Sequence, residues 1–325
     1  MDPTPDLPAS ANAAAFSDPE DISDRGERVS HLIQDAGYFA HLSIYDFALQ
    51  YCRGGQVLDA GSGAGYGSAY LADRGARRVW GIDASAKAVA FSRHHFQRDN
   101  VSFQEMSLER IDGFTPHSFD LIYTSNTLEH VTNVMDFLRA AWSLLKPDGA
   151  LLAAVPPITD DRLEYLNLIN PYHVNLWTPR QWAHALGLYF ADIAPVLHGV
   201  VHAGADFKPE HFTPASTLTE KSFVFTPGTI DDMYRMFTLT AIFVARRPRP
   251  DSQVPAADAP LAFVDGSYTR PVGYIDPAQR VRLKKYFDMP APPFVVPAEP
   301  PHGLAGLFGR GRQVLGAVAR RLRQR

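Results

Sequence analysis

The sequence predicts an α/β fold in which a mostly parallel sheet of seven strands carries helices on both faces. Three observations predict it: short apolar segments alternate with segments of helical periodicity, the turns between them are short, and a glycine-rich loop joins the first strand to its helix. Strands that alternate with helices in this way pair in parallel, because each helix carries the chain back across the sheet.

The seven strands are expected at 56–59, 78–82, 101–104, 119–124, 150–155, 190–197 and 236–245. The helices between them are expected at 65–73, 85–97 and 134–145, with a further helix beginning at 178–179. Ser85 and Thr178 are side chains that cap helix N-termini, and Pro179 takes the first helical position, where a missing N–H costs nothing. The order of these signals defines the main domain.

The composition of the whole chain limits the kind of protein. Of 325 residues, 46% are hydrophobic and the net charge is -4, which suits a globular protein without a general attraction for nucleic acid. The single cysteine, Cys52, excludes a disulfide framework within the chain and argues against a cysteine zinc site. No secretory signal pattern and no apolar run of about 18 residues is present, so we expect a cytoplasmic protein.

Three regions are expected along the chain. Residues 1–24 are typical of a disordered leader, being rich in Pro, Ala, Ser and Asp. Residues 25–248 form the main domain, which opens with 25–52, predicted as two short helices broken at Gly37 that act as a lid. Residues 249–325 form an irregular, Pro-rich extension with helical patches at 276–287 and 304–325.

Within the main domain, residues 156–235 contain the segments expected to form the acceptor side. They include a long insertion at 200–233 with weak periodicity. Loops of that length are usually functional or disordered.

The segment 57–67, VLDAGSGAGYG, runs from an apolar strand through glycines into a helix. Glycines let a ligand approach the main chain, and N–H groups at a helix start favour a negative or polar ligand group. The alternative is a glycine-rich turn without a ligand, because short glycine motifs recur by chance. A dinucleotide is disfavoured because Tyr66 stands where Gly-x-Gly-x-x-Gly has its third glycine.

Asp83 ends the second predicted strand. An acidic residue about 20 positions after a glycine loop can accept hydrogen bonds from both hydroxyls of a ribose. The alternative is that Asp83 helps to cap the helix that Ser85 starts.

These segments together resemble the class I S-adenosylmethionine-dependent methyltransferases. The resemblance rests on 59–67, Asp83, 119–131 (FDLIYTSNTLEHV) and 144–151 (LLKPDGAL), and covers about residues 26–245. It implies a Rossmann-like methyltransferase fold with one antiparallel strand near the edge, and S-adenosyl-L-methionine as the cofactor.

Shorter stretches are similar to the subgroup of this family found with sugar and polysaccharide biosynthesis. They are GER at 26–28, HLSIY at 41–45, GYGS at 65–68 and PYHVNLWT at 171–178.

The resemblance implies a role for each matching residue of the loop and of the second strand. Gly61, Gly63 and Gly65, with Ser62 among them, would line the methionyl and ribose parts of the cofactor. Asp59 would orient the methionyl amino group.

The same resemblance assigns the two ends of the cofactor. Asp83 would hold the ribose, Ala84 and Met106 would flank the adenine, and Ser107 would lie near the adenine amino edge, where many relatives carry Asp. At the other end, the turn containing Asn126 would face the methionine moiety.

The N-terminal helices would close the pocket. Arg28 would be a carboxylate partner for the cofactor, with Tyr38 and Tyr45 beside it. The alternative for these three side chains is packing and surface charge.

Methyl transfer asks mainly for positioning, since the sulfonium already activates the methyl group. A hydroxyl acceptor must also lose a proton, and the candidate bases are His130, His173 and, less favoured, Glu129. His130 follows the fourth strand, where an open α/β sheet places its ligand crevice. His173 lies beside Tyr172 and Trp177 in the sequence; the alternatives are a structural role for His130 and an ordinary loop position for His173.

We expect no metal. His198 and His202, and the adjacent His94 and His95, are not accompanied by a carboxylate cluster near the expected crevice.

The last segment, 304–325, combines apolar residues at helical spacing with six arginines and no acidic residue. Such a helix can lie on an anionic membrane, so peripheral contact with the inner membrane surface is one interpretation. A solvated basic tail, or a helix docked on a partner protein, is the favoured alternative.

The sequence thus predicts an enzyme that methylates a hydroxyl of a small molecule or a glycan-linked acceptor by direct in-line transfer. The alternatives are a quinone-type, natural-product or nitrogen acceptor, and a partner subunit that binds S-adenosylmethionine without catalysis. Nucleic acid is not expected as a partner, since the main domain has no basic stripe. The sequence makes no prediction of oligomeric state.

Overall fold

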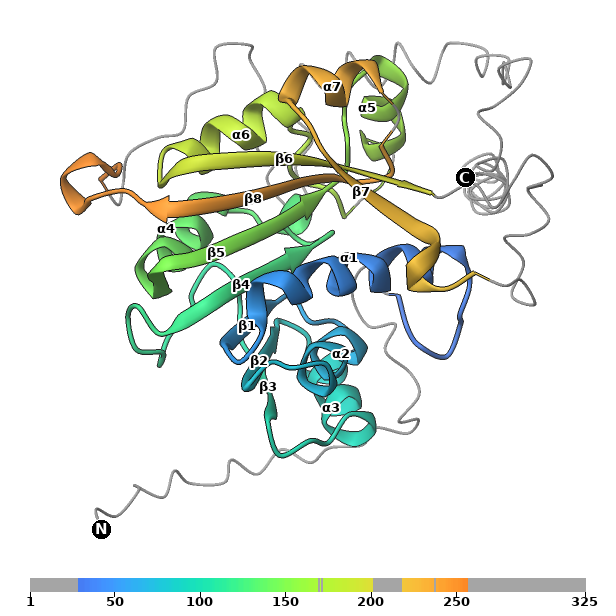
Figure 1. Ribbon diagram of the computed structural model, residues 1–325, viewed down its shortest axis with the longest axis vertical. Helices are drawn as coiled ribbons and strands as arrows, with labels where there is room; N and C mark the ends of the chain where they lie inside the picture. The colour runs from blue at the N-terminus through green and yellow to red at the C-terminus, as the bar shows by residue number, and fades with distance from the viewer. Residues whose placement is uncertain (1–28, 169, 171, 201–217, 237, 257–325) are drawn as a thin grey trace, which may run out of the picture.

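The computed structural model describes residues 29–168, 170, 172–200, 218–236 and 238–256. In this part of the chain a sheet of eight strands runs in the order β3-β2-β1-β4-β5-β8-β6-β7 (Figure 1). The strands are β1 Gln56–Ala60, β2 Arg78–Asp83, β3 Val101–Glu105, β4 Phe119–Ser125, β5 Leu145–Val155, β6 Phe190–Val200, β7 Phe223–Pro227 and β8 Ala241–Pro248. The predicted α/β class is therefore confirmed.

The sheet has a parallel half and an antiparallel half. Strands β3, β2, β1, β4 and β5 pair in parallel, whereas β8 is antiparallel to both β5 and β6, and β7 is antiparallel to β6. The expected total of seven strands is one too few. The additional strand β7 lies inside 200–233, which was expected to be an insertion without regular structure.

The helices cover both faces of the sheet. They are α1 Ala36–Cys52, α2 Tyr66–Asp73, α3 Ala86–His95, α4 Val134–Leu144, α5 Asp161–Leu168, α6 Pro179–Gly187 and α7 Ile230–Arg235, with 3-10 turns η1 Leu128–His130, η3 Glu220–Ser222 and η4 Asp251–Gln253. Ser85 caps α3, and Thr178 caps α6 with Pro179 in its first turn, as the sequence predicts.

Alternate residues of the central strands point to opposite faces and fill two cores. Val57 and Leu121 belong to the core under α1 and α2, whereas the next residues, Leu58 and Ile122, belong to the core under α4 and α6. All four are fully buried, and burying such a side chain contributes roughly 1.5–3 kcal/mol. Because both faces are covered, the central strands are almost continuously apolar.

The expected break at Gly37 is wrong, because one continuous helix, α1, crosses that position. The Asp35 side chain accepts a hydrogen bond from the Tyr38 amide at 3.1 Å and so caps the helix one residue before it begins. Gly37 therefore falls in the first turn, where its low helix propensity matters least.

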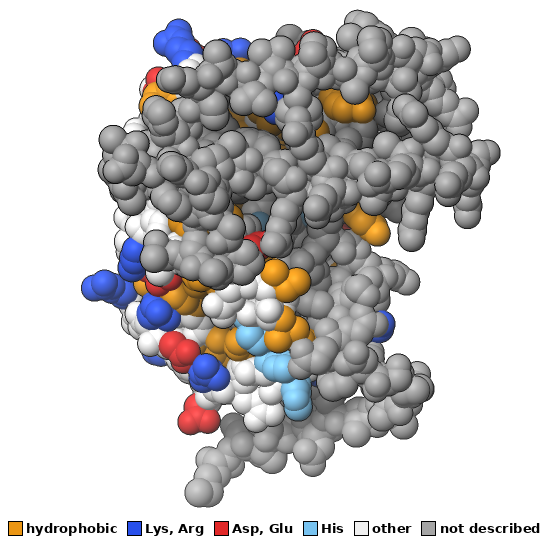
Figure 2. Space-filling model, turned by 90° about the vertical axis from the view of Figure 1, so that its right-hand side faces the viewer, with side chains coloured by type: hydrophobic (Ala, Val, Ile, Leu, Met, Phe, Trp, Pro, Cys, Tyr) orange, Lys and Arg blue, Asp and Glu red, His pale blue; other side chains and the backbone are white. Residues whose placement is uncertain are grey.

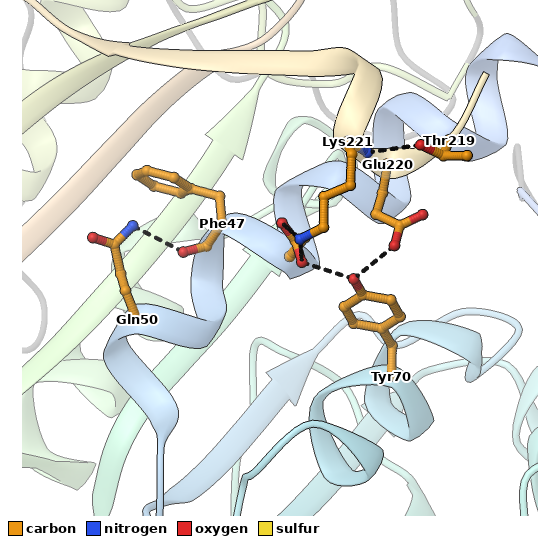
Figure 3. A network of polar contacts seen from close by, with 7 residues as sticks. Phe47, Gln50, Tyr70, Thr219, Glu220 and Lys221 are labelled. Carbon is orange, nitrogen blue, oxygen red and sulfur yellow. Dashed lines mark hydrogen bonds and ion pairs between the residues drawn. The ribbon is translucent and has the colours of Figure 1, made fainter. Parts of the chain in front are cut away.

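A polar network fixes the segment before β7 against the first two helices (Figure 3). The Lys221 ammonium contacts both carboxylate oxygens of Asp46 in α1, at 2.6 and 2.7 Å. The Tyr70 hydroxyl of α2 lies 2.8 Å from Asp46 and 3.2 Å from Glu220. Burial and then these carboxylates raise the pKa of Tyr70, so its hydroxyl remains a donor. The antiparallel half is thereby joined to the helices that lie over the parallel half.

An aromatic cluster lies where the chain before α1 meets α3. The His31 ring centroid is 4.9 Å from that of Phe96 and 5.5 Å from that of His95, and His95 lies 4.1 Å from Phe91. Figure 2 shows histidine and hydrophobic side chains side by side in the lower half of the face that it presents. These contacts hold the first described residues against α3, and Val29, two residues before His31, lines the cavity described below.

Several expectations fall outside the described residues: the leader 1–24, Arg28, and the patches 276–287 and 304–325. Among the helices that are described, none is both long enough and apolar enough to cross a bilayer.

Candidate active site

The loop after β1 is built from three glycines with left-handed backbones. Their φ angles are 87° at Gly61, 52° at Gly63 and 81° at Gly65, values that L side chains rarely adopt. The amides of Gly61 and Ser62 donate to the Ile82 carbonyl at 2.8 and 2.9 Å. Backbone hydrogen bonds therefore hold the loop against the end of β2.

Asp83 links this loop to the next helix. Its Oδ2 accepts from the Gly63 amide at 2.9 Å, and its Oδ1 accepts from the Ser85 amide at 2.9 Å. Each carboxylate oxygen has more than one lone pair, so one oxygen can accept more than one hydrogen bond. Asp83 therefore braces the start of α3, which was the alternative interpretation, and it also lies in the wall of a cavity.

A cavity of about 450 Å³ opens at the carboxyl ends of the parallel strands. Eight of the residues expected to bind cofactor or to act on the acceptor line it: Gly61, Ser62, Gly63, Asp83, Ala84, Ser107, Asn126 and His130. Its size lies within the roughly 300–1,000 Å³ usual for small-molecule sites.

Other expected residues lie outside the lining. Gly65 begins α2 and faces α3, where an added Cβ would overlap Ser92, so its glycine is required by packing. Met106 packs against the core under α4 and α6, and Asp59 and His173 lie behind the cavity wall.

Asp59 is fully buried at the end of β1, between the two helices above it. The Tyr45 hydroxyl donates to its oxygens at 3.2 and 3.3 Å, and the Ser68 hydroxyl donates to Oδ2 at 2.5 Å. Burial raises the pKa of Asp59 to about 7, and the two hydroxyls offset part of that rise. Tyr45 itself lines the cavity, so it connects the buried carboxyl with the ligand space.

Asn126 and His41 also line the cavity. Asn126 has a left-handed backbone with φ 48°, and its amide donates to the Ala154 carbonyl at 2.8 Å. Its side-chain Nδ2 lies 3.5 Å from His41 Nε2. Burial lowers the pKa of His41 to about 4, so its imidazole is neutral at neutral pH.

His130 and His173 lie together at one side of the cavity, with ring centroids 4.8 Å apart. His130 Nδ1 is 2.9 Å from the Tyr172 carbonyl, and His173 Nδ1 is 2.8 Å from Asn167 Oδ1. His130 lines the cavity, whereas His173 is buried behind it and is 8% exposed. The two base candidates are therefore neighbours, although only His130 lines the space that an acceptor would fill.

The residues present fit an adenosine that carries a methionine. An added Cβ at Gly63 would meet nothing within 4 Å, which shows open space beside the loop backbone. The carboxylate of Asp83 lies at the edge of that space, as a ribose-binding group must.

The comparisons with known proteins agree with this geometry. Residues 58–153 match the family model described as "Methyltransferase domain". Over these residues the chain is therefore similar to methyltransferase domains, and S-adenosyl-L-methionine is the cofactor that this similarity supports.

Individual relatives match over part of their length. The chain is 35% identical over 120 residues to a ubiquinone biosynthesis O-methyltransferase of Neisseria meningitidis serogroup C, covering 36% of this chain and 50% of that protein. It is 32% identical over 117 residues to the mitochondrial ubiquinone biosynthesis O-methyltransferase of Bos taurus, covering 34% and 31%. An S-adenosylmethionine-dependent methyltransferase structure from Mesorhizobium loti matches at 25% identity with a TM-score of 0.35, over 37% of this chain and 54% of that one. The chain thus spans half or less of these curated relatives.

These relatives bear on the narrower resemblance stated above. None of the three carries a name from sugar or polysaccharide biosynthesis. The assignment to that subgroup gains no support.

Sequence reasoning missed several residues that line the cavity. His41, Glu109 and Val174 were not singled out as site residues, yet all three lie in its wall. A signal existed for His41 and Val174, which belong to the HLSIY and PYHVNLWT stretches quoted above, but not for Glu109.

Proposed function

We propose that this protein transfers the methyl group of S-adenosylmethionine to a hydroxyl of a small aromatic acceptor, such as a quinone-type phenol. One observation carries the proposal: the glycine loop, Asp83 and His130 line the same cavity. A group bound at the loop therefore shares its space with a titratable side chain. The names of the relatives favour a phenol over a glycan hydroxyl, and the glycan acceptor is retained as the second candidate.

The reaction is a single displacement. The acceptor hydroxyl gives up its proton, its oxygen lone pair forms the new C–O bond, and the S–CH₃ bond breaks with its electron pair going to sulfur. The products are a methyl ether, S-adenosylhomocysteine and a proton. Holding the two reactants in line supplies roughly 7–11 kcal/mol of the catalysis.

The chain's own residues divide the work. The loop backbone and Asp83 bind and orient the cofactor, and Asn126 with neutral His41 shapes another part of the wall. We assign removal of the hydroxyl proton to His130, which lines the cavity and has His173 beside it. Assistance to proton removal is typically worth about 10²–10⁴-fold in rate.

Calorimetry with S-adenosylhomocysteine tests cofactor binding. We expect the full chain to bind it and to ignore NAD. Asp83→Asn removes the negative charge and one acceptor oxygen, and a lost charged hydrogen bond of about 1.5–3 kcal/mol weakens binding by roughly 10–100-fold. Asp112→Asn, at an exposed acidic residue paired with Arg110, is the matched control. Binding of NAD alone, or an unchanged affinity in Asp83→Asn, would contradict the assignment.

Acceptor class is tested by counting S-adenosylhomocysteine released with a panel of catechols, simple phenols and free sugars. We expect turnover with phenolic compounds. Turnover with sugars but not with phenols would instead select the glycan acceptor.

A further inference from the structure

We propose that Tyr172 and Glu109 select the acceptor, so that the cavity takes an uncharged aromatic molecule in preference to one that carries a carboxylate or a phosphate. The fate of the bound molecule as a methyl acceptor rests on the proposed function, whereas its binding does not. Both side chains line the cavity, and both are joined to the turn after β4 that carries His130.

Tyr172 presents an aromatic ring at the exposed edge of the cavity. It belongs to the cavity lining and is nevertheless 48% exposed. The other exposed large hydrophobic residues in the described part of the chain lie outside the lining; they are Leu32, Ile33, Val224 and Met236. An apolar surface that is exposed at the edge of a cavity is typical of a binding site, because a ligand that packs on it removes it from water. An aromatic ligand gains the further attraction between two rings.

The main chain holds Tyr172 beside the imidazole that is assigned to proton removal. Its amide donates to Asn170 Oδ1 at 3.0 Å, and its carbonyl lies 2.9 Å from His130 Nδ1. Because a carbonyl only accepts, Nδ1 is the donor of the second bond. The contact to His130 is thus made by the backbone of Tyr172, and a substitution of the ring leaves both hydrogen-bonding groups in the chain.

Apolar side chains continue the wall next to Tyr172. Val131 and Val174 line the cavity, and the Val174 amide donates to the carbonyl of Glu129, two residues before Val131, at 2.7 Å. A sugar in contact with such a wall would leave hydroxyls without hydrogen-bond partners, which is costly. The face of an aromatic ring needs no such partners, so this part of the wall suits a ring.

Glu109 adds a negative charge beside the same turn. Its Oε1 accepts from the amides of Thr132 and Asn133 at 2.7 and 3.0 Å, which fixes the carboxylate next to the residues that follow His130. Glu109 is exposed and lines the cavity, so an acceptor that enters the cavity passes close to a fixed negative charge.

The remaining charges in the wall have the same sign. The charged side chains among the described lining residues are Asp83 and Glu109, and this part of the lining contains no Lys or Arg. The positive sulfonium of the cofactor is attracted by such a wall. An anionic acceptor would be repelled, with no described cation in the wall to offset the repulsion.

The test measures how a matched pair of acceptors binds to the full chain saturated with S-adenosylhomocysteine. The acceptors 4-methylcatechol and 3,4-dihydroxybenzoate share the ring and both hydroxyls, and they differ in the charge of the third substituent. Calorimetry gives the two affinities, and methyl transfer from S-adenosylmethionine is measured in parallel. We expect 4-methylcatechol to bind more tightly by about 10-fold.

Two variants separate the contributions of charge and ring. Glu109→Gln keeps an oxygen that can accept from the two amides and removes the charge, so it should bind 3,4-dihydroxybenzoate about 3–10-fold more tightly and 4-methylcatechol as before. Tyr172→Leu keeps an apolar side chain and removes the ring, so it should weaken 4-methylcatechol binding by about 3–10-fold. Tyr172→Phe should restore that binding.

The matched controls change the same residue types outside the cavity lining. Asp112→Asn removes an acidic charge that is paired with Arg110, and Tyr234→Leu removes a ring of α7. Both should bind the two acceptors as the unaltered chain does. Every variant is also titrated with S-adenosylhomocysteine, which shows that it has folded.

The outcomes for this inference differ from those for the proposed function. Unchanged 4-methylcatechol binding in Tyr172→Leu, an unchanged preference in Glu109→Gln, or no binding of either acceptor overturns the inference. Methyl transfer to 4-methylcatechol in the presence of any of the first two results leaves the proposed function standing. Acceptor binding that depends on both residues, without methyl transfer to either acceptor, supports the inference and refutes the proposed function.

Discussion

Asp59 combines full burial with a carboxyl group that has no ionic partner among its hydrogen-bonding neighbours, Tyr45 and Ser68. Burial raises its pKa from 3.8 to about 7. Between these two pH values the folded chain keeps a proton that the unfolded chain has lost. The free energy of unfolding therefore falls as the pH rises through that window, and it levels off above about pH 7.

Asp59→Asn removes this ionisation, so we expect the variant to gain stability relative to the unaltered chain as the pH rises. The gain should reach about 2–3 kcal/mol between about pH 5 and pH 8, since each pKa unit corresponds to 1.36 kcal/mol. Urea unfolding at the two pH values measures it, with exposed Asp112→Asn as the control. A constant stability difference across this range would show that Asp59 ionises normally.

His130 makes a second prediction at this scale. His130→Gln keeps a polar side chain and removes the imidazole that lines the cavity, so turnover should fall by roughly 10²–10⁴-fold. S-adenosylhomocysteine affinity should change little, because the loop and Asp83 remain. Equal losses of affinity and of turnover would assign His130 to cofactor binding instead.

At the scale of elements, the contact of α1 with α2 depends on the absence of a side chain. A Cβ at Gly67 would overlap the Tyr45 ring, which also donates to Asp59. We expect Gly67→Ala to destabilise the fold by about 1–3 kcal/mol through overpacking. Gly187→Ala, in α6 with no atom within 4 Å, should instead stabilise it by about 0.5–1 kcal/mol. Thermal unfolding of the two variants, compared side by side, measures the difference; a neutral Gly67→Ala would mean that the helices separate without cost.

The elements that the sequence predicted well were those with strong local signals. Ser85 and Thr178 fixed the starts of α3 and α6, and the alternation from β1 to β5 fixed the parallel half. Gly37 was misinterpreted because the Asp35 cap, which shifts it into a first turn, is a contact of the folded helix. Strand β7 was missed because five residues that end in Pro227 carry little periodic signal, and their pairing partner β6 is supplied by the fold.

In the candidate site, too, residues with a local signal were predictable, whereas contacts between distant segments were not. Gly61, Gly63 and Asp83 were predictable, because a loop and the end of the next strand lie close in every such fold. The contacts of Tyr45 with Asp59 and of His173 with His130 join segments that are distant in the sequence. Spacing along the chain holds no information about such contacts.

At the scale of the whole molecule, cavity and antiparallel half are separate. The described residues that line the cavity lie between positions 29 and 174, and none comes from β6, β7 or β8. We therefore expect a chain ending at residue 256 to keep its affinity for S-adenosylhomocysteine. Calorimetry on both lengths measures this, and a large loss would place part of the cofactor site beyond residue 256.

The same pair of chains tests the basic segment. Flotation with vesicles of anionic lipid should recover the full chain more than the shortened one if 304–325 lies on membranes. Equal recovery of both would leave the solvated tail or the docked helix as the explanation.

The Glu129 carbonyl accepts hydrogen bonds from the amides of both Val174 and Asn175. These bonds hold the turn after β4 and the loop at 173–175 together. Val174 forms part of the cavity wall, so a displacement of the loop that carries it would change the shape of the cavity. Thermodynamic reciprocity then requires that a ligand that shifts this loop changes the affinity for adenosine by the same factor as adenosine changes the affinity for that ligand. Measuring either affinity in the presence of the other ligand gives the coupling free energy between the loop and the cavity.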